Sequence, residues 1–83
     1  MALFMDVHTI EGGVSAADVA AAHQKDLEIQ DKYGVDYQRY WVDEANGTIF
    51  CLVEADNAED AVSVHREAHG LVPDSIHPVS EHT

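Results

Sequence analysis

The stretch VDYQRYWVDEANGTIFCLVEA, residues 35–55, decides the fold. Its two arms, residues 35–42 and 48–55, are rich in aromatic and β-branched side chains, which favour strands. Asn46-Gly47 lies between the arms, and this pair suits a tight hairpin turn because both residues tolerate positive φ. The stretch therefore predicts two antiparallel strands joined by a short turn.

Two helices are predicted, one before and one after this hairpin. Ser15 caps the first, over residues 16–33, and Asn57 caps the second, which runs to about residue 69. The stripe expected to face the core in the first helix consists of Ala16, Val19, Ala20, His23 and Leu27. In the second helix the corresponding stripe consists of Ala58, Ala61, Val62, His65 and Ala68.

The first strand is predicted over residues 2–10, where side chains alternate between two faces. One face carries Leu3, Met5 and Val7. Because this set is uniformly apolar, we expect it to face the core. Asp6 and His8 are then expected on the opposite, more open face.

The last strand is predicted over about residues 75–80, and Pro78 within it favours an edge position because proline cannot donate to the ladder. The order is strand, helix, strand, strand, helix, strand. This order predicts an α+β fold, a ferredoxin-like βαββαβ sandwich in which two helices cover one face of an antiparallel sheet. A chain of 83 residues fits one such domain, spanning residues 1–83.

The charge balance excludes several classes of partner. Sixteen acidic residues against four basic ones give a net charge of −12, which argues against nucleic acid and anionic membrane surfaces. No apolar run approaches the ~18 residues of a membrane span and no signal segment opens the chain, so we expect a cytoplasmic protein. The acidic residues, Asp26 among them, are expected on a solvated surface.

Six histidines among these carboxylates form the ligand set that borderline divalent metals prefer. His65 and His69 stand one helical turn apart, with Cβ atoms roughly 6 Å apart, so both rings can converge on one ion. His23, from the other helix, is the candidate third ligand within the chain. Asp6 and His8 are candidates only if the chain dimerises or if the end of their strand reaches around, because we expect them to point away from the helices.

The predicted topology brings His8, His69 and His77 to one end of the sheet. These candidates also have structural interpretations: a helix-end pair for His65 and His69, and a hydrogen-bonded core residue for His23. For Asp6 and His8 the structural interpretation is a solvated strand face or a polar dimer interface. Solvent exposure is expected for His77 and His82. Cys51, the single cysteine, has apolar neighbours that favour a buried, inert thiol, although a Cys–His metal site is possible.

Several segments together resemble a known family. They are Ala22-His23, Asp26-Leu27, Tyr33-Gly34-Val35, Tyr40-Trp41, residues 50–55 and VHREAHGL at residues 64–71. The family that they resemble is that of the small bacterial nickel-binding proteins of ferredoxin-like fold, long known as a domain of unknown function. The resemblance covers nearly the whole chain. It implies a homodimer of ferredoxin-like subunits that carries Ni²⁺ at sites on the dimer surface and serves in nickel sequestration or detoxification.

The sequence thus predicts a non-enzymatic protein that holds Ni²⁺, or a similar divalent ion, through His65, His69, His23, His8 and Asp6. Binding should weaken sharply between neutral pH and about pH 5.5, because a histidine with a pKa of about 6.5 becomes protonated there. One alternative is a small dimeric enzyme, monooxygenase- or isomerase-like, with a pocket lined by Trp41, Tyr37, His8 and Cys51. A regulatory module whose histidines respond to pH is another.

Overall fold

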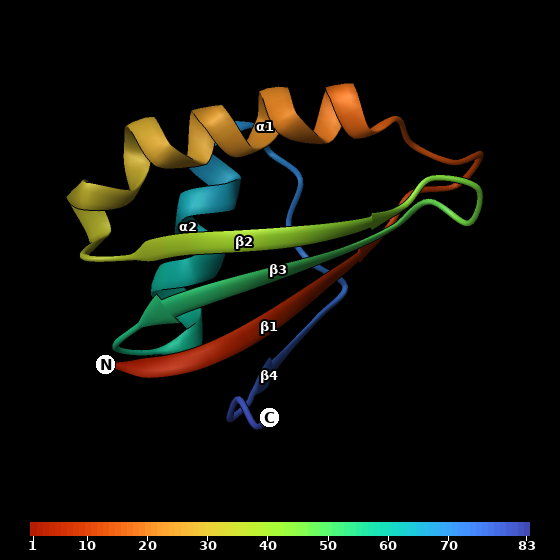
Figure 1. Cartoon of the computed structure of the whole chain (residues 1–83). Coiled ribbons are helices and arrows are strands. Elements are labelled where there is room, and N and C mark those ends of the chain that lie inside the picture. The colour runs from red at the N-terminus through yellow and green to blue at the C-terminus, as the bar shows by residue number, and fades with distance from the viewer.

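The computed structural model describes residues 1–83. The chain passes through β1 (Ala2–Thr9), α1 (Ala16–Ile29), the short 3-10 helix η1 (Gln30–Tyr33), β2 (Asp36–Asp43), β3 (Thr48–Ala55), α2 (Ala58–Ala68) and β4 (Ser75–Pro78). The strands form one antiparallel sheet in the order β2-β3-β1-β4. Both helices cover the same face of this sheet (Figure 1). The predicted ferredoxin-like arrangement is confirmed.

The predicted hairpin joins β2 to β3, and its turn packs against the end of β1. Gly47 in this turn has φ +67°, a left-handed conformation that glycine adopts without strain. The Ile10 N–H donates a hydrogen bond of 2.7 Å to the Gly47 carbonyl oxygen. The turn that sets the register of β2 and β3 therefore also holds the end of β1.

Both helices begin where the sequence predicts. The Ser15 Oγ accepts a hydrogen bond from the Asp18 N–H at 3.1 Å, and the Asn57 Oδ1 accepts one from the Asp60 N–H at 2.9 Å. The first helix ends earlier than predicted, because residues 30–33 form η1 in place of a last α-helical turn. Gly34, with φ +66°, then ends the helical segment.

The prediction of which face of β1 lies inside was wrong. Phe4, Asp6 and His8 are buried beneath the helices, whereas the apolar set is half-buried on the open face of the sheet. That set is Leu3, Met5 and Val7. Alternation separates the two faces of a strand, but it does not say which face the helices cover. Here the polar face is inside because its side chains find hydrogen-bond partners there.

The predicted stripe of α1 was wrong in part: Val19 is buried as expected, but Ala16, Ala20 and Leu27 are exposed. The buried residues of α1 are Val19 and Asp26, whereas Leu27 is 38% exposed. Val19 and Asp26 are seven positions apart, two helical turns, so they lie on the same side of the helix. A helix that presents Asp26 to α2 rotates Leu27 toward solvent.

A bulge in β2 brings two tyrosines to the helix-facing side of the sheet. Tyr37 pairs with Val53 and Tyr40 with Cys51, with a register shift between residues 37 and 39. Val53 and Cys51 are two positions apart and share one face of β3, so their tyrosine partners share it too. Without the bulge, the spacing of three would place Tyr37 and Tyr40 on opposite faces.

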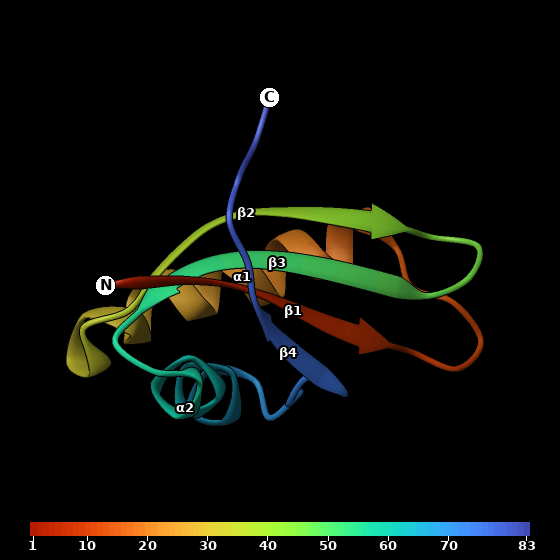
Figure 2. The same cartoon turned by 90° about the horizontal axis from the view of Figure 1, so that it is seen from below.

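The apolar core lies between the sheet and the helices, with Val53 and Ala55 of β3 against Ala61 and Val64 of α2. As Pro78 predicts, β4 is an edge strand, paired with β1 alone. The chain after β4 then passes across the face opposite the helices (Figure 2).

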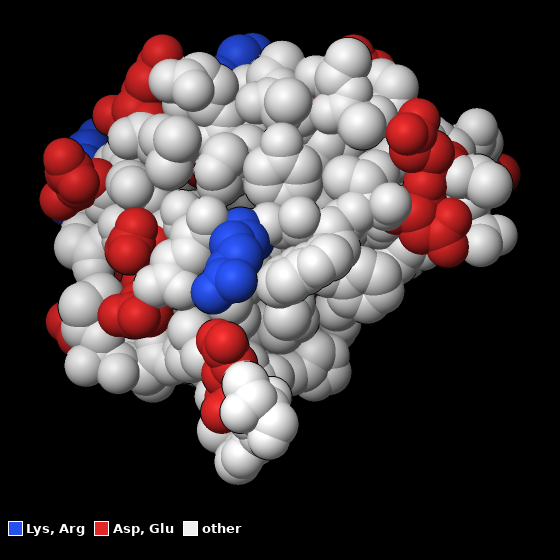
Figure 3. Space-filling model, in the orientation of Figure 1, with Lys and Arg blue, Asp and Glu red and all other residues white.

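Neither helix combines the length and apolar character needed to cross a bilayer. Acidic side chains are spread around the margin of the face seen in Figure 3, as the charge balance predicts.

Replacing Gly47 with alanine is expected to destabilise the protein by more than about 2 kcal/mol, because the positive φ is strained for alanine and its Cβ would collide with the Ile10 carbonyl oxygen. Gly12→Ala is the matched control, since Gly12 has φ +87° with open space around it. Urea unfolding measures both. Equal losses for the two variants would show that the contact with Ile10 is unimportant.

Candidate metal centre

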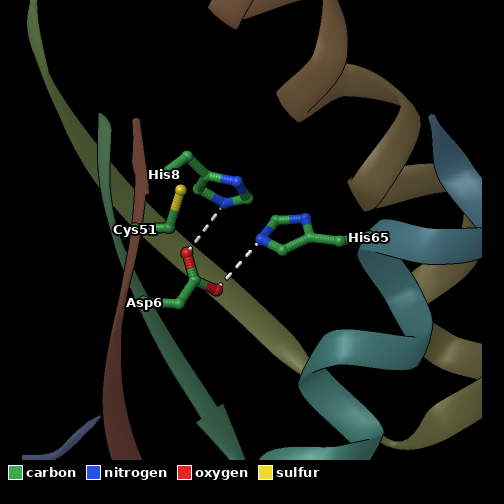
Figure 4. Close-up of side chains that lie close together, drawn as sticks. All are labelled: Asp6, His8, Cys51 and His65. Atoms are coloured by element: carbon green, nitrogen blue, oxygen red, sulfur yellow. Dashed lines mark hydrogen bonds and ion pairs between the residues drawn. The ribbon is translucent and has the colours of Figure 1, made fainter. Parts of the chain in front are cut away.

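Four buried side chains from three elements meet between the sheet and α2. Asp6 and His8 project from β1, and Cys51 projects from β3, where it pairs directly with Asp6. His65 faces them from α2 (Figure 4). Each of the four is between 0% and 7% exposed. The regular side-chain alternation of β1 and the antiparallel register of β3 therefore bring these groups together.

Asp6 is the centre of this cluster. Its Oδ1 accepts a hydrogen bond from the His8 Nε2 at 3.1 Å, and its Oδ2 accepts one from the His65 Nε2 at 3.0 Å. The Tyr37 hydroxyl donates to the same Oδ2 at 2.7 Å. Burial by itself raises the pKa of Asp6, but the hydrogen bonds from His65 and His8 outweigh it and hold the pKa well below its usual range. Asp6 is therefore a buried carboxylate anion.

His65 lies between two carboxylates. Its Nδ1 is 2.9 Å from the Asp26 Oδ1, while its Nε2 faces Asp6. Burial lowers the pKa of His65, but the hydrogen bonds and charges of Asp26 and Asp6 prevail and raise it to about 9. At neutral pH the ring is an imidazolium that donates from both nitrogens.

Asp26 joins the second helical histidine to the cluster. Its Oδ1 also accepts from the His69 Nε2 at 3.0 Å, and the His69 Nδ1 accepts from the Leu71 N–H at 3.1 Å. Burial raises the pKa of Asp26, but hydrogen bonds from His65 and His69 lower it to a greater extent. The expectation that Asp26 is solvated was wrong. Its spacing of seven from Val19 was the one available signal that it lies on the buried side of α1.

Cys51 carries a protonated thiol. Burial is the main reason that its pKa is raised, and the negative charge of Asp6 adds to this effect. The sequence-based prediction of a buried thiol is confirmed. The same position also places the sulfur among metal-binding groups, so burial and ligand geometry are compatible at this residue.

Two groups of side chains have donor atoms that lie within 4.8 Å of one another. The first group is Asp6, His8, Cys51 and His65, and the second is Asp26, His65 and His69. Donors that surround one ion tetrahedrally at about 2.1–2.3 Å are about 3.4–3.8 Å apart. A contraction of about 1 Å would therefore bring the first group to a complete four-donor site.

The first group fits an ion better than the second. If His65 binds through Nε2, its Nδ1–H remains on Asp26, which is the carboxylate support that metal-binding histidines usually have. In the second group, the His69 Nδ1 accepts from a backbone N–H, so a neutral ring carries its proton on Nε2. Binding an ion through that Nε2 would require breaking the bond to Leu71.

The structure brings together Asp6, His8 and His65, three of the five predicted ligands, within one chain. Asp6 and His8 therefore need no second subunit to reach His65, contrary to the expectation from the predicted faces of β1. His69 lies beside them, with its ring centroid 5.0 Å from that of His65.

The other histidines lie outside both donor groups. His23 packs against the Tyr40 ring, with centroids 4.8 Å apart, and burial lowers its pKa. His77 does not join His8 and His69, because it is exposed and bonds to the Ser75 hydroxyl. His82 is exposed as well. The exposure predicted for both is confirmed.

Comparison with known proteins identifies a matching family and a similar solved structure. Residues 4–79 match the family described as nickel responsive protein SCO4226-like. The crystal structure of SCO4226 from Streptomyces coelicolor A3(2) is 39% identical in sequence, with a TM-score of 0.90, and the match covers 99% of this chain and 100% of that one. No curated protein sequence matches. The likeness spans every element that contributes to the buried cluster.

The stability of the metal-free protein is expected to fall as pH rises from about 6.5 to about 9. The pKa of His65 is about 9 in the folded state and about 6.5 in the unfolded state. The protonated ring therefore contributes its full share of the free energy of unfolding below about pH 6.5, and this share is lost as pH rises through about 9. The loss should reach about 3 kcal/mol. Urea unfolding with EDTA measures it. In the His65→Gln variant the decline should disappear; the same decline in that variant would assign it to another group.

Proposed function

Because this chain belongs to the SCO4226-like family of nickel responsive proteins, we propose that it binds Ni²⁺ at Asp6, His8, Cys51 and His65. The observation that carries this proposal is the convergence of four buried donors from three elements within 4.8 Å. The family inferred from the sequence is confirmed. Of the predicted ligands, Asp6, His8 and His65 stay in the proposed site, and Cys51 joins them. His69 and His23 are assigned to its surroundings.

The charges of the cluster support this proposal. Without an ion, Asp6 contributes one negative charge, protonated His65 one positive charge, and the Cys51 thiol none. A bound divalent ion would replace the His65 Nε2 proton and the thiol proton, because a coordinating thiol is deprotonated. His8 would bind through Nε2 with its ring proton moved to Nδ1, which changes no charge. Two protons are thus exchanged for two positive charges. The buried net charge does not change, so the exchange adds no buried charge.

The donor set suits Ni²⁺ and its neighbours. Two imidazoles, a thiolate and a carboxylate are borderline ligands, for which affinity rises from Co²⁺ through Ni²⁺ to Cu²⁺. The site lies beneath the helices, where solvent reaches it little. This position favours holding the ion over exchanging it rapidly, and we assign the protein to cytoplasmic nickel sequestration.

An enzyme remains the alternative, since a cavity contains both His8 and Cys51 as that interpretation requires. The chemistry of the groups favours metal binding instead. The raised pKa of Cys51 makes its thiol a poor nucleophile. Both nitrogens of His65 are engaged by carboxylates, so this ring has no free nitrogen to act as a base.

A homodimer forms the second part of the proposal, through the open face of the sheet. Trp41 is 48% exposed and Phe50 is 37% exposed on this face, next to the half-buried apolar set of β1. The C-terminal segment, through Val79, Ser80 and Glu81, already covers part of this face beside Leu3 and Met5 (Figure 2). The exposed aromatic side chains that remain are typical of a protein interface. The C-terminal segment and a second copy would together cover Leu3, Met5 and Val7, which accounts for the apolar pattern that made β1 appear to face the core.

Titration calorimetry with Ni²⁺ on tag-free protein is expected to show saturable binding that weakens at least about tenfold in His8→Ala and in Cys51→Ala. Wild-type protein should also develop a thiolate-to-metal absorption band that Cys51→Ala lacks. Because two protons leave, apparent affinity should fall by about a hundredfold per pH unit below about pH 9. This range extends above the one expected from an unperturbed histidine.

The matched controls for this titration are His77→Ala and His82→Ala, since both histidines are exposed and lie outside the cluster. They should bind Ni²⁺ as the wild type does. Unchanged binding in His8→Ala and Cys51→Ala, with loss in the exposed variants, would place the ion on the surface and refute the buried site.

The dimer is tested by Trp41→Asp, which should convert a dimer into a monomer in sedimentation velocity because it places a charge in the apolar face. Trp41 is exposed in the single chain, so the fold should persist. Leu27→Asp removes an apolar side chain of the helix layer that is 38% exposed, and should leave the dimer intact. A monomeric wild type would contradict this assignment.

A further inference from the structure

A cavity of about 230 Å³ lies beside the buried cluster, bounded by α1, α2 and the sheet. Its apolar wall consists of Ile10, Val14, Val19, Ala22, Ile49 and Leu71. The polar end is formed by Asp26, His65 and His69, with His8 and Cys51 beside them. A single metal ion held by four converging donors does not need this space. The apolar wall indicates a ligand with a hydrocarbon body.

The charge around the cavity is negative. Asp6 and Asp26 are buried carboxylates, and His65 between them supplies one positive charge when protonated. The sum is −1 with His65 protonated and −2 without its proton. Asp18 adds an exposed carboxylate to the lining, and no lysine or arginine lines the cavity. Since the whole chain also carries −12, the cavity attracts cations and repels anions.

One acceptor at the polar end has spare capacity. The Asp26 Oδ1 accepts from both His65 and His69, whereas its Oδ2 takes part in no hydrogen bond within the chain. No fully buried polar side-chain atom lacks a partner, so this Oδ2 is not sealed from solvent, and Asp26 lines the cavity. The rings of His23 and Tyr40, which pack together in the lining, add aromatic surface that also favours a cation.

We propose that this cavity binds a small organic ammonium ion, a primary amine with a short aliphatic body. The ammonium group donates to the Asp26 Oδ2, and the aliphatic body packs against Val19, Ala22 and Ile49 of the apolar wall. The volume equals about eight times the ~30 Å³ that a water molecule occupies in the liquid, which is room for about six to eight heavy atoms. Drug-sized ligands need larger pockets.

An inorganic cation would not use the features that define this cavity. A hydrated ion gains nothing from six apolar side chains, whereas an alkylammonium satisfies the charge and the wall together. A carboxylate of the same shape would be repelled by Asp26 and Asp6. A neutral alcohol would fill the same volume without neutralising the charge. An experiment must therefore compare ligands that have the same shape but different charges.

The test is an NMR titration of metal-free, full-length protein in EDTA with three ligands of one carbon skeleton: isopentylammonium, isopentanol and isovalerate. We expect saturable shifts at Val19, Ala22 and Ile49 with isopentylammonium, binding at least tenfold weaker with isopentanol, and none with isovalerate. Equal affinity for the three ligands, or no binding of the ammonium ion, overturns the proposal. Because no metal is present, this result is independent of the nickel titration.

Variants locate the binding. Ala22→Leu fills the cavity and should abolish ammonium binding, because Ala22 is half-buried in its wall. Asp26→Asn keeps an acceptor but removes the charge, and should reduce the preference for isopentylammonium over isopentanol to less than threefold. Glu59→Gln removes one exposed charge at the start of α2 and should leave affinity unchanged. Binding that survives Ala22→Leu lies elsewhere and refutes the cavity as its site.

Discussion

The imidazolium of His65, held between the carboxylates of Asp6 and Asp26, is the interaction on which this structure depends. Asp6 comes from β1, His65 from α2 and Asp26 from α1, so a single ring ties the sheet to both helices. Isolated charges at this depth would be strongly unfavourable, and each becomes tolerable because the other two are present. The position of the two helices on the sheet consequently depends on the protonation of this ring.

The order and approximate bounds of the elements could be predicted because their signals are local. The Asn46-Gly47 turn, the caps at Ser15 and Asn57, and the proline in the last strand each act within a few residues. The faces of β1 and α1 could not be predicted in the same way. Asp6 and Asp26 are inside because both pair with His65, which is 59 positions from Asp6 and 39 positions from Asp26. Sequence periodicity carries no information about partners at such separations.

The candidate site shows the same division. The spacing of His65 and His69 pointed to the helix that contributes to both donor groups. Asp6 and His8 were recognised as chemically suitable but were assigned to the wrong face. Asp26 was missed because it is one of sixteen acidic residues, nearly all of which are compatible with a solvated surface. Tyr37 reaches Asp6 through a bulge in β2, and no turn residue or proline marks that bulge in the sequence.

The arrangement of His65 also explains how one cluster can be stable with and without an ion. In the metal-free state its Nε2 proton joins it to Asp6, and in the proposed nickel-bound state the ion takes the place of that proton. The Nδ1–H bond to Asp26 is the same in both states, so the ring does not need to turn. In the proposed exchange the proton therefore occupies the position that the ion would take, and the His65 ring is already oriented for it.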